Sequence, residues 1–320
     1  MEGKILPVEE NPRPRAYLHY AFPMSILLTN NYYNDWIINN FIQLVYDPNN
    51  SCAYDYHEFS YEKWPCLKTV TMDATFLKDV EPVSYIISQL AQDRYCFAWV
   101  DCFYIAGAQG FDKRHATEGI LIYGFDSDRS LFHILTYDTN RRYTTLTISF
   151  CNVADSILSD EFQYLQFVNV IPTASVDYHF ESIRDKLLCY LSGQNYDLDD
   201  LKYHRRDEIR AYGTDACRCL GDYMINCEDD CFDLRYPYLF VEHKEVMIFR
   251  INMILQTGKF MNYPYTSEER DSYCEECRKV LYLCMKYNTS NQKSKDMRRH
   301  VSDCIHRLLI RERELLLPLL

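Results

Sequence analysis

Three side chains near the middle of the chain have the types needed for acid–base chemistry. His115 follows a charged turn, Glu118 begins the next apolar run, and Asp138 follows the apolar run after that. A histidine titrates near neutral pH and can act as a general base, and a partly buried carboxylate can take a proton from an amine. Three structural roles are the alternatives: an exposed loop residue at 115, a polar strand start at 118, and a turn at 138.

A second set of charged residues lies in the otherwise apolar second half of the chain. Arginine and lysine bind phosphate groups well, so this set is a candidate for holding a phosphodiester. The alternative, which the sequence favours, is an internal ion-pair network between helices. The set is Arg235, His243, Lys244 and Arg250. A further basic surface is expected around Lys202, His204, Arg205, Arg206 and Arg210.

The 14 cysteines predict reduced thiols, because no export signal and no apolar run of about 18 residues is found. We therefore expect a cytoplasmic protein without a membrane span. Cys274 and Cys277, like the close pairs from Cys217 to Cys231, lie in helical patterns without the Gly or Pro of zinc-binding turns. We accordingly expect no metal site.

Composition narrows the class of protein further. The 320 residues are 48% hydrophobic and 15% aromatic, with few Gly and Pro, which excludes a disordered or collagen-like chain. The formal net charge of −12 argues against bulk electrostatic binding to nucleic acid or to an anionic membrane.

The first half of the chain predicts helices followed by strands. Apolar residues at steps of three and four indicate helix, and short aromatic or β-branched runs bounded by turn residues indicate strand. The expected helices cover 22–29, 33–46 and 80–92, with another beginning near Ser149; the expected strands cover 95–104, 118–126, 131–137, 143–148 and 164–171.

The second half predicts almost nothing but helix. The expected helices cover 178–191, 207–227, 238–255, 266–287 and 293–315. Ser192-Gly193 and Gly258 are typical helix ends, and Pro172 begins the most plausible linker. The sequence therefore predicts an α+β domain over residues 1–172 and a helical domain over residues 173–320.

Several stretches resemble one family of bacterial biosynthetic proteins. They are Val100-Asp101-Cys102-Phe103-Tyr104, the run from His115 to Asp126, Tyr137-Asp138, the segment Trp36–Leu44, Asp233-Leu234-Arg235, Glu242-His243-Lys244 and Arg250-Ile251. Together they are similar to the butirosin-biosynthesis-protein-H-like family, which is related in fold to the leader-cleaving cysteine peptidases of bacteriocin exporters. The resemblance implies a papain-like domain, with a central antiparallel sheet packed on N-terminal helices, followed by the helical domain.

The resemblance also implies a chemistry. Such proteins move an acyl group from the 4′-phosphopantetheine thioester of a carrier protein to an amine. The family's site has a Cys at the start of the first long helix, a His that opens a strand, and an Asp or Asn on the next strand. Only the Asp is retained here, as Asp138.

The other two family positions differ in this chain. Glu118 stands where the His is expected, although a shift of three residues would restore His115, and no Cys occurs in residues 1–50. Near the first helix, Ser25 is a possible nucleophile or a helix cap. His19 and Tyr20 are the neighbouring candidates for substrate binding.

These observations lead to two expectations. The first is an acyltransferase with an altered triad, acting on an acyl or peptidyl carrier protein and an amine or hydroxyl acceptor, with no cofactor of its own. The second is a catalytically degenerate relative that binds a carrier protein or partner enzyme as a scaffold. Neither nucleic acid nor membrane is an expected partner, and a homodimer is possible.

Overall fold

The chain folds into two compact units in the computed structural model. The first comprises residues 1–33 and 60–176, and the second comprises residues 34–59 and 177–320. The structure describes residues 3–30, 33–49, 53–57, 64, 66–73, 77, 80–171, 180–195, 210–227, 230–291 and 293–320. The boundary predicted at residue 172 and the basic run 202–206 lie outside the described residues.

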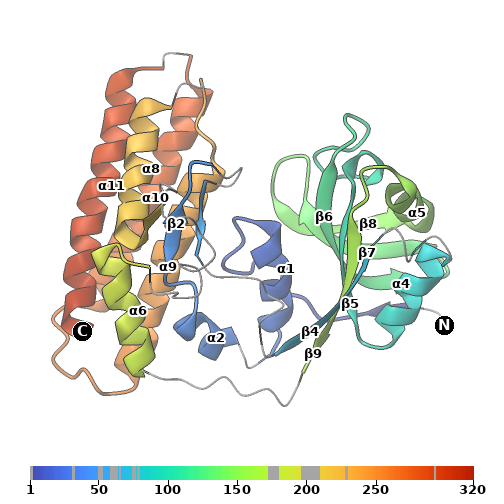
Figure 1. Cartoon of the computed structure of the whole chain (residues 1–320), viewed down its shortest axis with the longest axis horizontal. Helices are drawn as coiled ribbons and strands as arrows, with labels where there is room; N and C mark the ends of the chain where they lie inside the picture. The colour runs from blue at the N-terminus through green and yellow to red at the C-terminus, as the bar shows by residue number, and fades with distance from the viewer. Residues whose placement is uncertain are drawn as a thin grey trace. The chain divides into compact units, whose positions relative to one another are not determined.

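An antiparallel sheet forms the centre of the first unit (Figure 1). Its strands lie in the order β4-β9-β5-β6-β7-β8, and β1 pairs with the far end of β6. The strands are β1 (Gly3–Ile5), β4 (Leu67–Asp73), β5 (Tyr95–Asp101), β6 (Thr117–Asp126), β7 (Leu131–Tyr137), β8 (Tyr143–Ser149) and β9 (Tyr164–Val170). The five strands predicted from residue 95 onward are therefore confirmed, whereas β1 and β4 were not predicted.

Helices cover both faces of this sheet (Figure 1). Phe22 of α1 (Leu18–Leu27) packs on Phe97 and Tyr143 of one face. The other face carries α4 (Pro82–Ala91) and α5 (Phe150–Leu158), through the ring pairs Tyr85–Phe167 and Phe150–Phe132. Ser149 caps α5 by accepting from the backbone N–H of Asn152.

The second unit is mainly helical, as predicted. It contains α6 (Phe180–Ser192), α8 (Gly213–Asn226), α9 (Arg235–Gln256), α10 (Ser267–Thr289) and α11 (Lys295–Leu316). Thr266 and Glu269 form a capping box at the start of α10. Gly193 and Gly258, which follow α6 and α9, have the positive φ values that favour glycine after a helix.

Residues 33–46 do not form the single helix that the sequence predicts. The helix α2 covers only Tyr33–Asn39, and Phe41 has φ +56°, which no α-helix allows. Beyond it, β2 (Leu44–Tyr46) pairs with β3 (Tyr54–Tyr56) and β10 (Ala211–Tyr212) in a small antiparallel sheet. Tertiary pairing thus overrides the helical spacing of the apolar residues.

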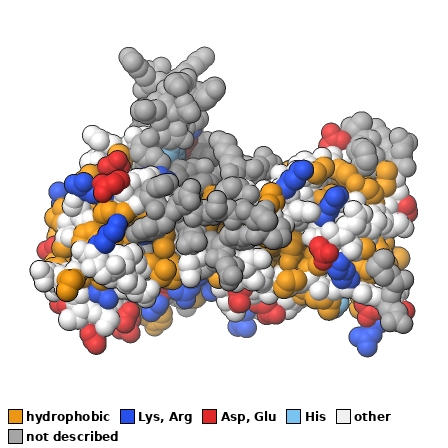
Figure 2. Space-filling view, turned by 90° about the horizontal axis from the view of Figure 1, so that it is seen from below, with side chains coloured by type: hydrophobic (Ala, Val, Ile, Leu, Met, Phe, Trp, Pro, Cys, Tyr) orange, Lys and Arg blue, Asp and Glu red, His pale blue; other side chains and the backbone are white. Residues whose placement is uncertain are grey.

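Charged side chains are mixed in sign on one face of the molecule (Figure 2). Figure 2 shows Lys and Arg interspersed with Asp and Glu on the face it presents, without one large basic patch. Within the part of the chain that is described, no helix combines the length and apolar character needed to cross a membrane.

Candidate functional site

The structure pairs His115 with Asp101, a residue that the sequence did not single out for catalysis. The Nδ1 atom of His115 lies 2.7 Å from Oδ2 of Asp101. Asp101 ends β5, and His115 lies two residues before β6, which pairs with β5. Because Asp101 lies opposite Thr117 in this pairing, the hairpin brings the two side chains together.

The carboxylate of Asp101 is buried and accepts three hydrogen bonds. Besides His115, it accepts hydrogen bonds from the hydroxyl of Ser159 at 2.6 Å and from the backbone N–H of Phe103 at 3.0 Å. Burial alone raises the pKa of Asp101, but these hydrogen bonds outweigh it and hold that pKa below its ordinary value. Asp101 is therefore an anion that orients the imidazole ring.

The ring of His115 is held in place, although its side chain is about half exposed. Its ring stacks on Phe103, with the centroids 4.2 Å apart and the planes 17° apart. The side chain of His115 is nevertheless 53% exposed, whereas that of Asp101 is 0% exposed. Since a carboxylate only accepts, Nδ1 carries the hydrogen of this bond, and in the neutral ring Nε2 is then the nitrogen that can accept a proton.

Cys102 directly follows Asp101 in the chain, but its thiol is not activated. Cys102 is fully buried, and its thiol donates weakly to the carbonyl of Arg114 at 3.6 Å. Burial raises the pKa of Cys102, and the nearby carboxylate of Glu118 raises it further. A protonated, buried thiol has the opposite properties to a catalytic cysteine.

Glu118 lies on the sheet face opposite α1. A side chain at Gly119 would meet Phe22 and Leu18 of α1 at 3.1 and 3.2 Å, so position 119 faces α1. Successive side chains of a strand alternate, which turns Glu118 toward the other face, where Cys102 contacts it. Burial raises the pKa of Glu118, and its Oε2 is buried with no hydrogen-bond partner among the described residues.

Asp138 directly follows β7 and holds its own turn together. It pairs with Ala108 in an isolated bridge, whereas the register of β6 with β7 runs only as far as Leu121 and Leu135. The carboxylate of Asp138 accepts from the backbone N–H groups of Asn140 at 2.7 Å and Arg142 at 2.8 Å. The bond from Arg142 is the main reason that the pKa of Asp138 lies below its ordinary value.

Of the candidates on α1, Ser25 and Tyr20 are buried and His19 is half-buried. Ser25 lies in the second half of the helix, not at its start, and its hydroxyl is 3.0 Å from that of Tyr143. His19 and Tyr20 pack together with their ring centroids 4.1 Å apart. Burial lowers the pKa of His19 to about 4.

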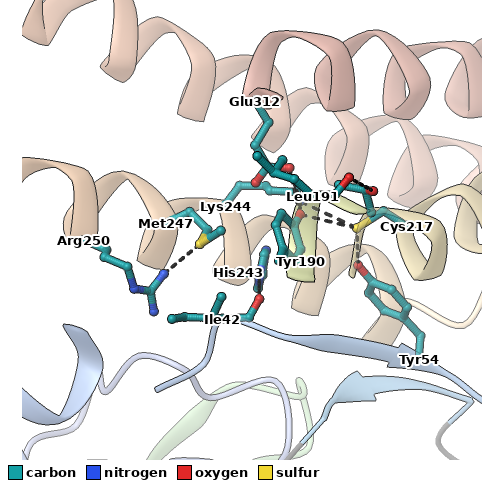
Figure 3. Close-up of polar contacts among 11 residues, drawn as sticks. Ile42, Tyr54, Tyr190, Leu191, Cys217, His243, Lys244, Met247, Arg250 and Glu312 are labelled. Atoms are coloured by element: carbon teal, nitrogen blue, oxygen red, sulfur yellow. Dashed lines mark hydrogen bonds and ion pairs between the residues drawn. The ribbon is translucent and has the colours of Figure 1, made fainter. Parts of the chain in front are cut away.

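The candidate phosphate-binding residues mostly form the internal network that the sequence left as the alternative (Figure 3). Lys244 is fully buried and bonds Glu312 at 2.8 Å and the hydroxyl of Tyr190 at 2.5 Å. Burial lowers the pKa of Lys244, but the neighbouring Cys217 and Glu312 outweigh it and hold that pKa above its ordinary value.

The other members of this set also contact the protein itself. His243 and Arg250 are fully buried and bond backbone carbonyls, among them those of Ile42 at 2.9 Å and Ile38 at 2.9 Å. Arg235, at the start of α9, forms a two-pronged pair with Asp233. The structure therefore leaves only Arg235 of this set near the surface.

Comparisons with known proteins add no relative. No family model matches the chain, and no curated protein matches it. Within the described residues, no group of three or more His, Cys, Asp and Glu side chains is arranged to hold a metal ion.

Asp101 and Ser159 are the site residues that sequence reasoning missed. Asp101 could have been found from the predicted hairpin, because an acid at the end of one strand lies near the residues that precede its partner strand. Ser159 carries no such signal, since it reaches Asp101 only through the way α5 ends against the sheet.

Proposed function

We propose that this protein transfers an acyl group from a phosphopantetheine thioester, carried by an acyl or peptidyl carrier protein, to an amine or hydroxyl acceptor. The observation that carries the proposal is the Asp101–His115 pair, in which the carboxylate fixes one imidazole nitrogen while the His115 side chain stays 53% exposed. The packing of α1 on an antiparallel sheet is compatible with the papain-like fold that the resemblance implies.

The proposed reaction needs no covalent enzyme intermediate. Nε2 of His115 takes a proton from the acceptor as its nitrogen or oxygen forms a bond to the thioester carbonyl. Asp101 stabilises the imidazolium that results. The carbon–sulfur bond then breaks, His115 returns the proton to the leaving sulfur, and the products are an amide or ester and the free thiol of the carrier. This route is consistent with the burial of both Ser25 and Cys102.

A non-catalytic scaffold is the second candidate function. The observation that favours it is the state of Cys102, which is buried and protonated beside the carboxylate of Glu118. On this hypothesis the first unit binds a carrier protein or a partner enzyme, and the Asp101–His115 pair only stabilises the turn before β6.

Acyl transfer can be measured by mass spectrometry with an acyl-loaded carrier protein and an amine acceptor. We expect wild-type turnover, with His115→Gln and Asp101→Asn each lowering its rate by roughly 10²–10⁴-fold. His133→Gln and Asp138→Asn are the matched controls, since His133 lies elsewhere on β7 and Asp138 serves a turn. Carrier binding without turnover would support the scaffold, and loss of turnover in Glu118→Gln alone would move the base to Glu118.

A further inference from the structure

A groove in the second unit is lined by residues of α6, α8 and α11. Its volume is about 280 Å³, close to the lower end of the range for small-molecule sites. Thr214 and Arg218 face it from the first half of α8, and His306 and Arg313 from the second half of α11. The groove lies within one unit, so its shape depends only on the packing of these helices.

The polar lining of the groove is basic. Arg218, His306 and Arg313 contribute to it, and no Asp or Glu does. This is unusual in a chain whose formal net charge is −12. Among the described residues, the side chain of Arg313 has no hydrogen-bond or ion-pair partner. Of the residues that the structure describes, Arg218 bonds only Asp215 of its own helix, an exposed pair of the kind that contributes little.

His306 is oriented by its own helix. Its Nδ1 lies 2.9 Å from the carbonyl oxygen of Ser302, so Nδ1 is the donor in that bond. The other nitrogen, Nε2, makes no hydrogen bond to the described residues. The two arginines thus offer donors from two helices to one ligand, with the His306 ring also in the lining.

Aliphatic side chains complete the lining. Leu191 and Leu309 are buried, while Ile310 is 64% exposed next to the cationic groups. A large exposed aliphatic side chain at the edge of a charged groove matches a ligand that has an apolar part.

We propose that this groove binds a small amphiphilic anion. Arg313, Arg218 and His306 hold its carboxylate or phosphate group, and its short aliphatic chain lies on Leu309 and Ile310. The proposal rests on the second unit alone and is independent of the proposed acyl transfer.

Calorimetric titration of the full-length protein tests this site. The probes are octanoate and octyl phosphate below their micellar concentrations, with octylamine and inorganic phosphate as comparisons. We expect saturable binding of at least one amphiphilic anion at one site per chain, no binding of octylamine, and at least tenfold weaker binding of inorganic phosphate.

Two variants locate the binding. Arg313→Gln and Ile310→Ser are each expected to weaken the affinity about tenfold or more, and both residues are exposed enough for the fold to survive. Arg299→Gln is the matched control, because Arg299 is an exposed arginine of α11 outside the groove. The proposal is overturned if neither anion binds, if octylamine binds equally well, or if Arg299→Gln weakens binding as much as Arg313→Gln.

Discussion

Burial sets the protonation of single side chains on α1 and β5. Asp101 is buried but remains an anion because three donors reach its carboxylate. His19 is held in its neutral form, because burial among Tyr17 and Tyr20 lowers its pKa. Asp101 therefore keeps its negative charge, whereas His19 stays uncharged.

The pKa of His19 predicts a specific loss of stability in acid. An unfolded histidine titrates near pH 6.5, whereas folded His19 titrates at about 4. Between these values the unfolded chain binds more protons, so the free energy of unfolding falls with falling pH, by at most about 1.4 kcal/mol per pH unit. Urea unfolding at pH 7, 5.5 and 4.5 measures this slope.

The variant His19→Gln should reduce that slope. His133→Gln is the control, because His133 lies on β7, away from the Tyr17–Tyr20 cluster. An unchanged pH dependence in His19→Gln would show that His19 is not buried in its neutral form.

At the scale of elements, the start of α8 depends on one glycine. Gly213 has φ +57°, and a Cβ at this position would lie 2.2 Å from the carbonyl oxygen of Tyr190 in α6. Gly258, after α9, also has a positive φ, but nothing lies within 4 Å of its Cβ position. Any other residue would be strained by the positive φ at both positions, but only at Gly213 would its Cβ also collide with neighbouring backbone atoms.

Alanine at the two glycines should therefore have unequal effects. Gly258→Ala is expected to lower the free energy of unfolding by about 1 kcal/mol, and Gly213→Ala by at least about 3 kcal/mol, because α6 and α8 must move apart. Chemical denaturation of both variants measures the difference. Equal losses would contradict the close approach of Gly213 to Tyr190.

Some strands could be predicted from the sequence alone, and others could not. The strands β5 to β9 were predictable because their runs are continuous and bounded by turn residues, as at Asp126–Ser130. The strand β4 alternates between buried and exposed residues only weakly, and β2 depends on pairing with segments far along the chain. At the site, His115 was a candidate from its type, but its partner Asp101 depends on strand register.

At the scale of the whole molecule, residues 34–49 belong with the helices that follow far later in the sequence. Arg250 bonds the carbonyl of Ile38, and His243 bonds that of Ile42. Lys244 and Glu312 join α9 to α11, and Tyr190 of α6 bonds both of them. A defect in this buried network should therefore loosen the whole second unit, residues 34–49 included.

The variant Glu312→Leu tests that connection. It leaves Lys244 buried without its carboxylate, which should cost about 3–5 kcal/mol, and adding Lys244→Met should recover most of the loss. Arg311→Gln removes a half-exposed pair with Glu276 and a surface hydrogen bond to the carbonyl of Glu269, and it should change stability by less than about 1 kcal/mol. Hydrogen exchange of Glu312→Leu should show lost protection in residues 34–49 and α6–α11, with β5–β8 unchanged. Equal loss of protection in β5–β8 would mean that the two units unfold as one.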